Sequence, residues 1–162
     1  MLRKINDGIE QICLTVGFLL LSGFILVVFA KVIVRNIFHI PMMWADEVAI
    51  TCFIWTVFLG AAVAVRNKLH YTVDLAPEKR KLNLTFDIVA HLFILSFLYV
   101  MIVHGYTFTM MGLSRLSTAL TIPLAVTFAA IPFSGVCMLF FTIEQIGKDV
   151  KRLRTTTNEV SS

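Results

Sequence analysis

Residues 35–47 read RNIFHIPMMWADE, residues 48–65 read VAITCFIWTVFLGAAVAV, and residues 66–74 read RNKLHYTVD. The middle segment contains eighteen residues without a charge. At about 1.5 Å per residue, a helix of that length is close to what is needed to cross the hydrocarbon core of a bilayer. A proline, a tryptophan and two carboxylates precede it, and arginine, lysine and histidine follow it. The stretch therefore predicts a transmembrane helix with different polar residues at its two ends.

The whole chain has the composition of a membrane protein. Of its 162 residues, 58% are hydrophobic and only 15% are charged, which is too apolar for a soluble domain. The net charge is +4, but the basic residues lie between apolar segments, so they indicate membrane topology and not a nucleic-acid surface. Cys13, Cys52 and Cys137 each lie inside an apolar segment, without metal-ligand spacing, and are interpreted as small buried thiols.

Apolar segments and helix-boundary residues predict an all-α integral membrane protein with four transmembrane spans. The spans cover about residues 12–34, 44–65, 86–106 and 123–143. Residues 1–11 predict a short amphipathic helix at the membrane interface that leads into the first span, and a second short interfacial helix is expected after Pro77. Pro132 should kink the fourth span. We expect one domain over residues 1–153 and a disordered tail over residues 154–162.

The distribution of basic residues predicts the orientation. Four spans place both termini on the same side of the membrane. Eleven of the fourteen lysines and arginines would lie on that side, and only Lys31, Arg35 and Arg115 on the other. The positive-inside rule then predicts cytoplasmic termini, with the 35–47 and 106–121 loops facing outward.

Polar and small residues near the ends and on one face of the spans are candidates for contacts with helices, subunits or lipid. Asp46 and Glu47, with Lys31 and Arg35 nearby, could form a salt-bridged corner between the first two spans, or a polar contact surface for another subunit; both remain open. Gly60 and Ala64 give the second span a small-residue face for close approach of another helix. The basic residues expected to lie near anionic lipid headgroups are Lys79, Arg80 and Lys81.

These patterns bear on two other functional classes. Transport by this chain alone is disfavoured, because secondary transporters place ionisable groups or broken helices at the bilayer midplane, and no Asp or Glu lies deep in any span. Haem binding in the manner of membrane cytochrome b subunits is an alternative, with His39 and His104 near the outer face and His70 and His91 near the inner face. Against it, His39 lies in a loop and His70 lies past the end of its span.

The chain resembles the small, Q-type membrane subunit of tripartite ATP-independent periplasmic (TRAP) transporters, over about residues 1–150. The motif residues of the first half are Arg35-x-x-Phe38-x-x-Pro41-x-x-Trp44-x-x-Glu47, Phe58-Leu-Gly60-Ala, Ala64-Val-Arg66, His70 and Asp74. A second segment runs from Ala119-Leu-Thr-Ile-Pro123 through Ala129-Ala-Ile-Pro132 and resembles the last span of the family. The chain departs from the family pattern at Ala45-Asp46 and lacks the glycines often present before His70.

This resemblance implies a role as a non-transporting scaffold in the bacterial inner membrane, without enzymatic activity or cofactor. In such systems a large M-type subunit carries the substrate and sodium sites and moves as an elevator. A soluble periplasmic protein delivers an organic acid, such as sialic acid or a C4-dicarboxylate, and the sequence leaves the choice of acid open. Membrane phospholipids are further expected partners.

Residue roles follow from the same resemblance. Arg35, Trp44 and Glu47 would organise the outer end, where subunits meet. Arg66, with the residues His70 and Asp74, would fix the inner end of the second span against the interfacial loop and lipid headgroups.

Overall fold

The computed structural model describes the backbone of residues 2–67 and 80–160, and the side chains of residues 6–67 and 92–147. Its helices are α1 (Leu2–Phe38), α2 (Met43–Arg66), α3 (Arg80–Leu113), α4 (Ala125–Phe128) and α5 (Ala130–Val160). Four segments are long and apolar enough to cross a membrane: Asn6–Phe38, Met43–Arg66, Leu92–Leu113 and Ala125–Gly147. The predicted all-α, four-span fold is confirmed.

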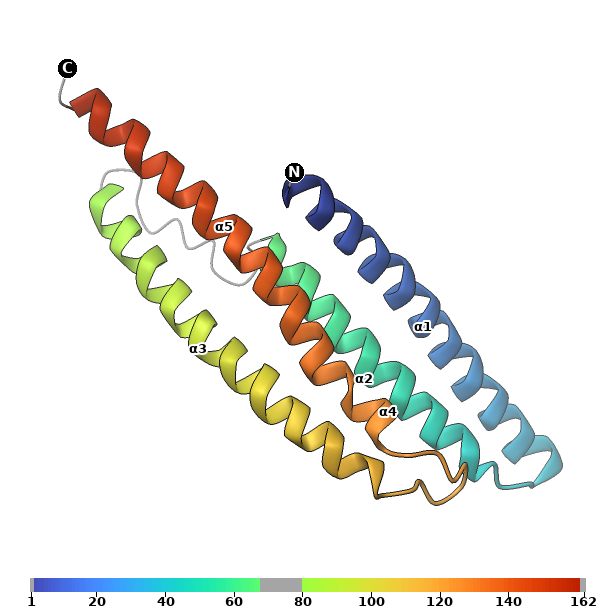
Figure 1. Cartoon of the computed structure of the whole chain (residues 1–162). Coiled ribbons are helices and arrows are strands. Elements are labelled where there is room, and N and C mark those ends of the chain that lie inside the picture. The colour runs from blue at the N-terminus through green and yellow to red at the C-terminus, as the bar shows by residue number, and fades with distance from the viewer. Residues whose placement is uncertain (1, 68–79, 161–162) are drawn as a thin grey trace.

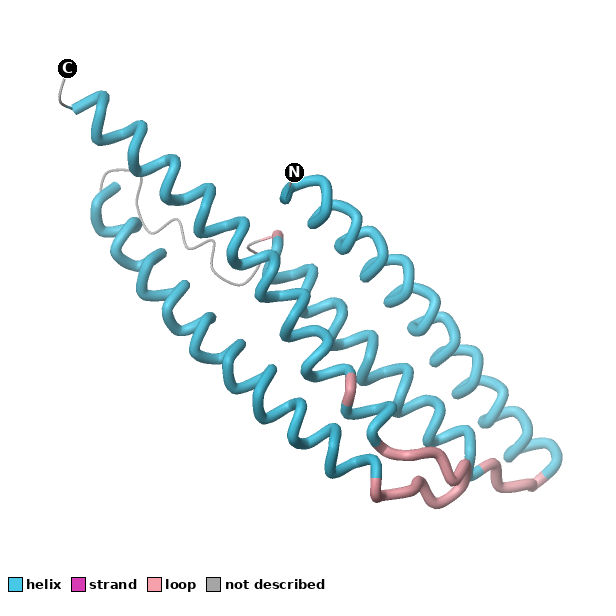
Figure 2. Tube along the Cα trace, viewed as in Figure 1, coloured by secondary structure: helices cyan, strands magenta, loops and turns pink. Residues whose placement is uncertain are grey.

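The four long helices form a row and not a closed bundle (Figure 1). In the described part of the chain, α1 packs on α2, α2 on α5, and α5 on α3, and neither α1 nor α2 contacts α3. The order in space is thus α1, α2, α5, α3, with the last helix inserted between the second and third. Both termini lie at one end of the row, called here the terminal end. The loops that follow α1 and α3 lie together at the other, called the loop end (Figure 2).

The row buries little of its own surface, as expected when lipid is the solvent. Phe141 of α5 is fully buried at the centre of the core, with Leu98 of α3 and Ala62 of α2 beside it. By contrast, Phe18 and Leu26 of α1 are 69% and 67% exposed. The core therefore lies along α5, and α1 is an edge helix.

Glycines allow α3 to approach α4 and α5 closely. A Cβ added at Gly112 would lie 2.8 Å from the backbone nitrogen of Ala125, and one at Gly105 would lie 3.2 Å from Cδ of Pro132. Such small-residue contacts are typical of helix pairs in membranes, where packing and not the hydrophobic effect drives association.

The fourth span is interrupted, as the proline predicts. The helix breaks at Ala129, between α4 and α5, three residues before Pro132. Pro132 has no N–H to donate to the carbonyl of Phe128, so the regular bond pattern is lost at this turn. The carbonyl of Val126 instead accepts a hydrogen bond from Nε1 of Trp55 on α2, at 2.9 Å. A neighbouring helix thus satisfies a carbonyl beside the break.

Three sequence-based boundaries need correction. The amphipathic segment 1–11 is not a separate interfacial helix, since Leu2–Phe38 form one continuous helix. Its polar side chains find partners on α2 and α5, which keeps it aligned with the span. Likewise α3 begins at Arg80 and not near residue 86, so the interfacial helix expected after Pro77 falls partly on α3 and partly outside the described residues.

The tail is the third correction. The segment from residue 154, expected to be disordered, continues α5 up to Val160. A helix that is already nucleated extends by one internal hydrogen bond per residue, without any apolar surface to bury.

Candidate functional site

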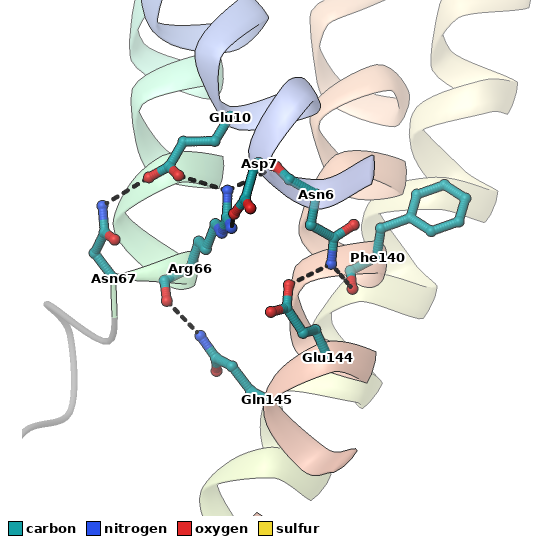
Figure 3. Close-up of polar contacts among 8 residues, drawn as sticks. All are labelled: Asn6, Asp7, Glu10, Arg66, Asn67, Phe140, Glu144 and Gln145. Carbon is teal, nitrogen blue, oxygen red and sulfur yellow. Dashed lines mark hydrogen bonds and ion pairs between the residues drawn. The ribbon is translucent and has the colours of Figure 1, made fainter. Parts of the chain in front are cut away.

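Arg66, the last residue of α2, is the centre of a polar cluster at the terminal end (Figure 3). Its guanidinium pairs with the carboxylate of Asp7 and, at 2.5 Å, with that of Glu10. It also donates to the backbone carbonyl of Asn6 at 2.6 Å and lies 5.4 Å from the ring centroid of Phe141. One side chain of α2 thereby contacts both α1 and α5.

Amide side chains complete this cluster. Asn6, only 2% exposed, donates to the carbonyl of Phe140 at 3.2 Å and to the carboxylate of Glu144 at 2.6 Å. Gln145 of α5 donates to the backbone carbonyls of Val65 and Arg66 at 2.6 and 2.8 Å, which satisfies two end groups of α2. We call Asn6, Asp7, Glu10, Arg66, Glu144 and Gln145 the Arg66 cluster.

The cluster joins three helices through charged groups. The Arg66 side chain is only 11% exposed and lies against two carboxylates, so the charge of the arginine is compensated inside the chain. Arginine suits such a site because its planar guanidinium can donate in several directions at once. The cluster fixes the terminal end of α1 to α2 and α5.

At the loop end, the first of two neighbouring carboxylates joins α1 to α2. Asp46 of α2 pairs with the ammonium of Lys31 on α1. Both side chains are partly exposed, at 56% and 26%, so this pair is a surface link between the two helices.

The second carboxylate, Glu47, holds the loop that follows α3. Residues 114–124, called here the hairpin loop, form an antiparallel bridge between Leu116 and Pro123. The Glu47 carboxylate accepts hydrogen bonds from the hairpin loop. The donors are the hydroxyls of Ser117 and Thr118 and the backbone N–H groups of Ala119 and Leu120. A single carboxylate of α2 thus fixes the backbone of this loop.

Two further contacts extend this attachment along α2. Thr51 shares a hydroxyl hydrogen bond of 2.8 Å with Thr127 of α4, and Trp55 donates to the carbonyl of Val126. Glu47, Thr51 and Trp55 are spaced by four residues, so they lie on one face of α2. That face binds the hairpin loop and α4.

The residues expected to organise the outer end do not form one site. Trp44 is 45% exposed, and Arg35 is exposed at the end of α1. In the described part of the chain, Lys31 pairs with Asp46, and Glu47 faces the hairpin loop instead of Arg35.

Gly60 and Ala64 are the small residues of α2 that are predicted to allow close approach of another helix. A Cβ added at Gly60 would have open space around it, with no neighbouring atom within 4 Å. Ala64 is partly buried. Among the helices that the structure describes, none makes the predicted close approach at Gly60.

Arg66, predicted to fix the inner end of the second span against the interfacial loop, contacts α1 and α5. The interfacial loop itself lies outside the described residues, so its contact with Arg66 stays a prediction. His70, Asp74 and Lys79 lie outside the described residues. Arg80 and Lys81 begin α3, where only the backbone is described.

Sequence reasoning missed the partners of Arg66 and Glu47. Asp7 and Glu10 have the spacing of one helix face, but nothing local indicates that this face meets Arg66, about sixty residues further along. The four donors to Glu47 include two backbone N–H groups, which have no sequence signature.

The polar groups at the two ends leave the middle of the row without charges: residues 11–30, 48–65, 88–114 and 116–143 contain no Asp, Glu, Lys or Arg. Among the residues that the structure describes, no group of three or more His, Cys, Asp or Glu side chains could hold a metal ion. The haem alternative required facing histidines on the second and third spans, but α5 lies between α2 and α3. The arrangement is suited to joining helices, and its charged groups lie outside the middle segments of the spans.

Comparison with known proteins places these features in a family. The family model described as "Tripartite ATP-independent periplasmic transporters, DctQ component" matches residues 24–152. A curated relative of similar length is the "Sialic acid TRAP transporter small permease protein SiaQ" of Vibrio cholerae, which is 27% identical over 165 aligned residues, covering 99% of this chain and 92% of the relative.

Two other relatives match over shorter stretches. The "C4-dicarboxylate TRAP transporter small permease protein DctQ" of Vibrio cholerae is 31% identical over 71 residues, covering 44% of this chain and 29% of that protein. The "Sialic acid TRAP transporter permease protein SiaT" of Haemophilus influenzae is 38% identical over 65 residues, covering 37% of this chain but only 11% of that protein.

Proposed function

The chain belongs to the DctQ family of tripartite ATP-independent periplasmic transporter components, and on that premise we propose that it is the non-transporting scaffold subunit of a sodium-coupled importer of organic acids. Family membership and the four apolar helices make it a multi-pass protein of a bacterial inner membrane. In this role it braces a large, elevator-type membrane subunit and contributes to docking of a periplasmic substrate-binding protein. It is a component of transport and not an enzyme.

The observation that carries this proposal is the open row of helices. Residues 11–30, 48–65, 88–114 and 116–143 are free of charge, and the contacts of the charged side chains lie toward the two ends. A transporting subunit needs polar groups or broken helices around a site at the midplane. In the described part of the chain the long helices have one break, at Ala129 near the loop end, and α1 and α2 have no counterpart to it. A row of helices without a charged midplane site, but with wide apolar faces, widens the static part of a complex within the bilayer.

The orientation and domain limits are part of the proposal. The excess of lysine and arginine beside the termini supports a cytoplasmic terminal end and a periplasmic loop end. The hairpin loop, fixed by Glu47, would then face the soluble partner. We take residues 1–153 as one membrane domain, because the Arg66 cluster links the start of α1 to α5.

For the substrate, similarity over nearly the whole chain favours sialic acid. The relative aligned over 99% of this chain is named for sialic acid, whereas the relative named for C4-dicarboxylates is aligned over 44%. We therefore propose N-acetylneuraminate as the first acid to test.

The test is uptake in reconstituted vesicles. Vesicles that contain this chain, a co-expressed large subunit and the periplasmic protein should accumulate labelled N-acetylneuraminate when a sodium gradient is applied. Vesicles that contain this chain alone should accumulate none, and vesicles without this chain should show reduced uptake. Sodium-driven accumulation by this chain alone would overturn the scaffold role. A Soret band in the purified chain would instead favour the haem alternative.

A further inference from the structure

A cavity of about 480 Å³ opens between α2 and the segment formed by the hairpin loop and α4. Its α2 wall includes Val48, Thr51 and Cys52, and its other wall includes Leu116 and Phe128. This volume is within the range of sites that bind small molecules. The proposed scaffold role does not require such a cavity, and nothing in the comparisons assigns a ligand to it.

The polar groups in the cavity wall are already bonded within the chain. Glu47 accepts from the hairpin loop, and Thr51 bonds to Thr127. Most other wall residues are aliphatic or aromatic. An apolar cavity is a poor site for water, because a bound water needs two to four polar partners. The lining therefore favours an apolar occupant.

The position of the cavity indicates where that occupant comes from. On α2 it extends from Glu47 to Ile54, which corresponds to about 10 Å along the helix axis from the loop end. Three residues of its wall, Ile50, Ile122 and Val126, are exposed by 57%, 44% and 50%. These exposed apolar side chains give the cavity a hydrocarbon-compatible rim, within the apolar segment of α2 that follows Glu47, where a membrane-spanning helix would meet acyl chains.

A cation lies beside the same wall. Arg115 is exposed in the hairpin loop and precedes Leu116, which lines the cavity. At this end of the row the carboxylate of Asp46 pairs with Lys31, and the carboxylate of Glu47 accepts hydrogen bonds from the hairpin loop. Within the described residues no ion pair involves Arg115, so its charge can pair with an anionic phosphate at the membrane surface.

We propose that this cavity binds one acyl chain of a membrane phospholipid, whose phosphate lies next to Arg115. The apolar lining, the exposed apolar rim and the adjacent cation together match the two parts of such a lipid. A side chain of a partner subunit would also be apolar, but it would not account for the cation. Binding of the lipid does not depend on the proposed scaffold role, and it is measured on this chain alone.

The experiment measures retained phospholipid by native mass spectrometry. The full chain is purified in mild detergent, delipidated, and then titrated with palmitoyl-oleoyl phosphatidylglycerol. The wild-type chain should bind one lipid in preference to further copies. Cys52→Phe and Val48→Phe, two independent variants that fill the cavity, should each weaken this binding by roughly tenfold.

Matched controls separate the cavity from general lipid contact. Val57→Phe enlarges a residue of α2 that is 49% exposed and does not line the cavity, so it should bind lipid as the wild type does. Arg115→Gln should weaken binding, whereas Arg35→Gln, at the exposed end of α1, should not.

Several outcomes would overturn the proposal. The first is lipid binding by both filling variants that equals that of the wild type. The second is a loss of binding in Val57→Phe as large as the loss in the filling variants. The third is lipid binding by Arg115→Gln that equals that of the wild type. If the filling variants bind lipid normally but no longer co-purify with a co-expressed large subunit, the cavity belongs to the subunit interface, and the lipid assignment is wrong while the scaffold role stands.

Discussion

Replacing Arg66 by alanine should detach the terminal end of α1. The lost contacts can be added up from the structure. The charged hydrogen bond to the carbonyl of Asn6 contributes about 1.5 kcal/mol. The pair with Glu10, whose side chain is 23% exposed, contributes about 1 kcal/mol, and the pair with Asp7, which is 56% exposed, less than about 0.5 kcal/mol. The contact with the Phe141 ring adds about 0.5 kcal/mol. The expected loss is about 3 kcal/mol.

Thiol labelling measures this loss locally. Cys13 of α1 is 4% exposed and lies one turn beyond Glu10, whereas Cys52 is only half-buried. Cys52 is replaced by serine and the buried Cys137 by alanine, so that the measured signal comes from Cys13. If α1 opens more often in Arg66→Ala, the labelling rate of Cys13 by a maleimide rises with the opening equilibrium. A change of about 3 kcal/mol corresponds to roughly a hundredfold faster labelling.

Arg35→Ala is the matched control, since it removes an exposed arginine from the loop end of α1. It should change stability by no more than about 0.5 kcal/mol. Arg66→Lys keeps the positive charge but loses the planar guanidinium with its several N–H donors. The labelling rate of Cys13 in this variant should therefore lie between those of the wild type and Arg66→Ala. If Arg66→Ala labels at the wild-type rate, or if Arg35→Ala labels as fast as Arg66→Ala, the cluster does not hold α1.

Three further predictions concern other parts of the row. Glu47→Gln should speed amide hydrogen exchange in the hairpin loop, because the carboxylate that accepts its N–H groups is lost, whereas Asp46→Asn should leave that exchange unchanged. Gly112→Ala should destabilise the chain by about 1–3 kcal/mol in thermal unfolding, because its Cβ would meet backbone at 2.8 Å, whereas Gly60→Ala, which has open space, should be neutral or stabilising. Phe141→Ala, at a position with 0% exposure, should cost about 3–5 kcal/mol; retention of the wild-type melting temperature would show that the core does not lie along α5.

The sequence predicts the spans well, because each depends on local information. Eighteen uncharged residues between Glu47 and Arg66 are sufficient to locate α2, and Pro132 is sufficient to predict an interruption in the last span. Burial is predicted for all three thiols from their apolar surroundings; the structure confirms it for Cys13 and Cys137, whereas Cys52 is only half-buried.

The order of the helices could not be predicted in this way. Polar residues such as Thr51 and Trp55 on one face of α2 indicate a contact but not which helix supplies it. The contacts that fix the order join distant residues, such as Glu47 with the hairpin loop and Arg66 with α1. Gly112 is one of eight glycines in the chain, and its close contact with α4 depends on where the hairpin loop returns.

The position of α5 between α2 and α3 has a consequence for biosynthesis. Because α2 and α3 do not touch in the described part of the chain, α3 enters the membrane before its neighbour has been synthesised. Until the hairpin loop and α5 emerge from the ribosome, the third helix has no packing contact with the first two. A nascent chain that stops before residue 114 would therefore contain a helical hairpin and a third helix not packed against it, and synthesis of the hairpin loop and the last span is the step that assembles the row.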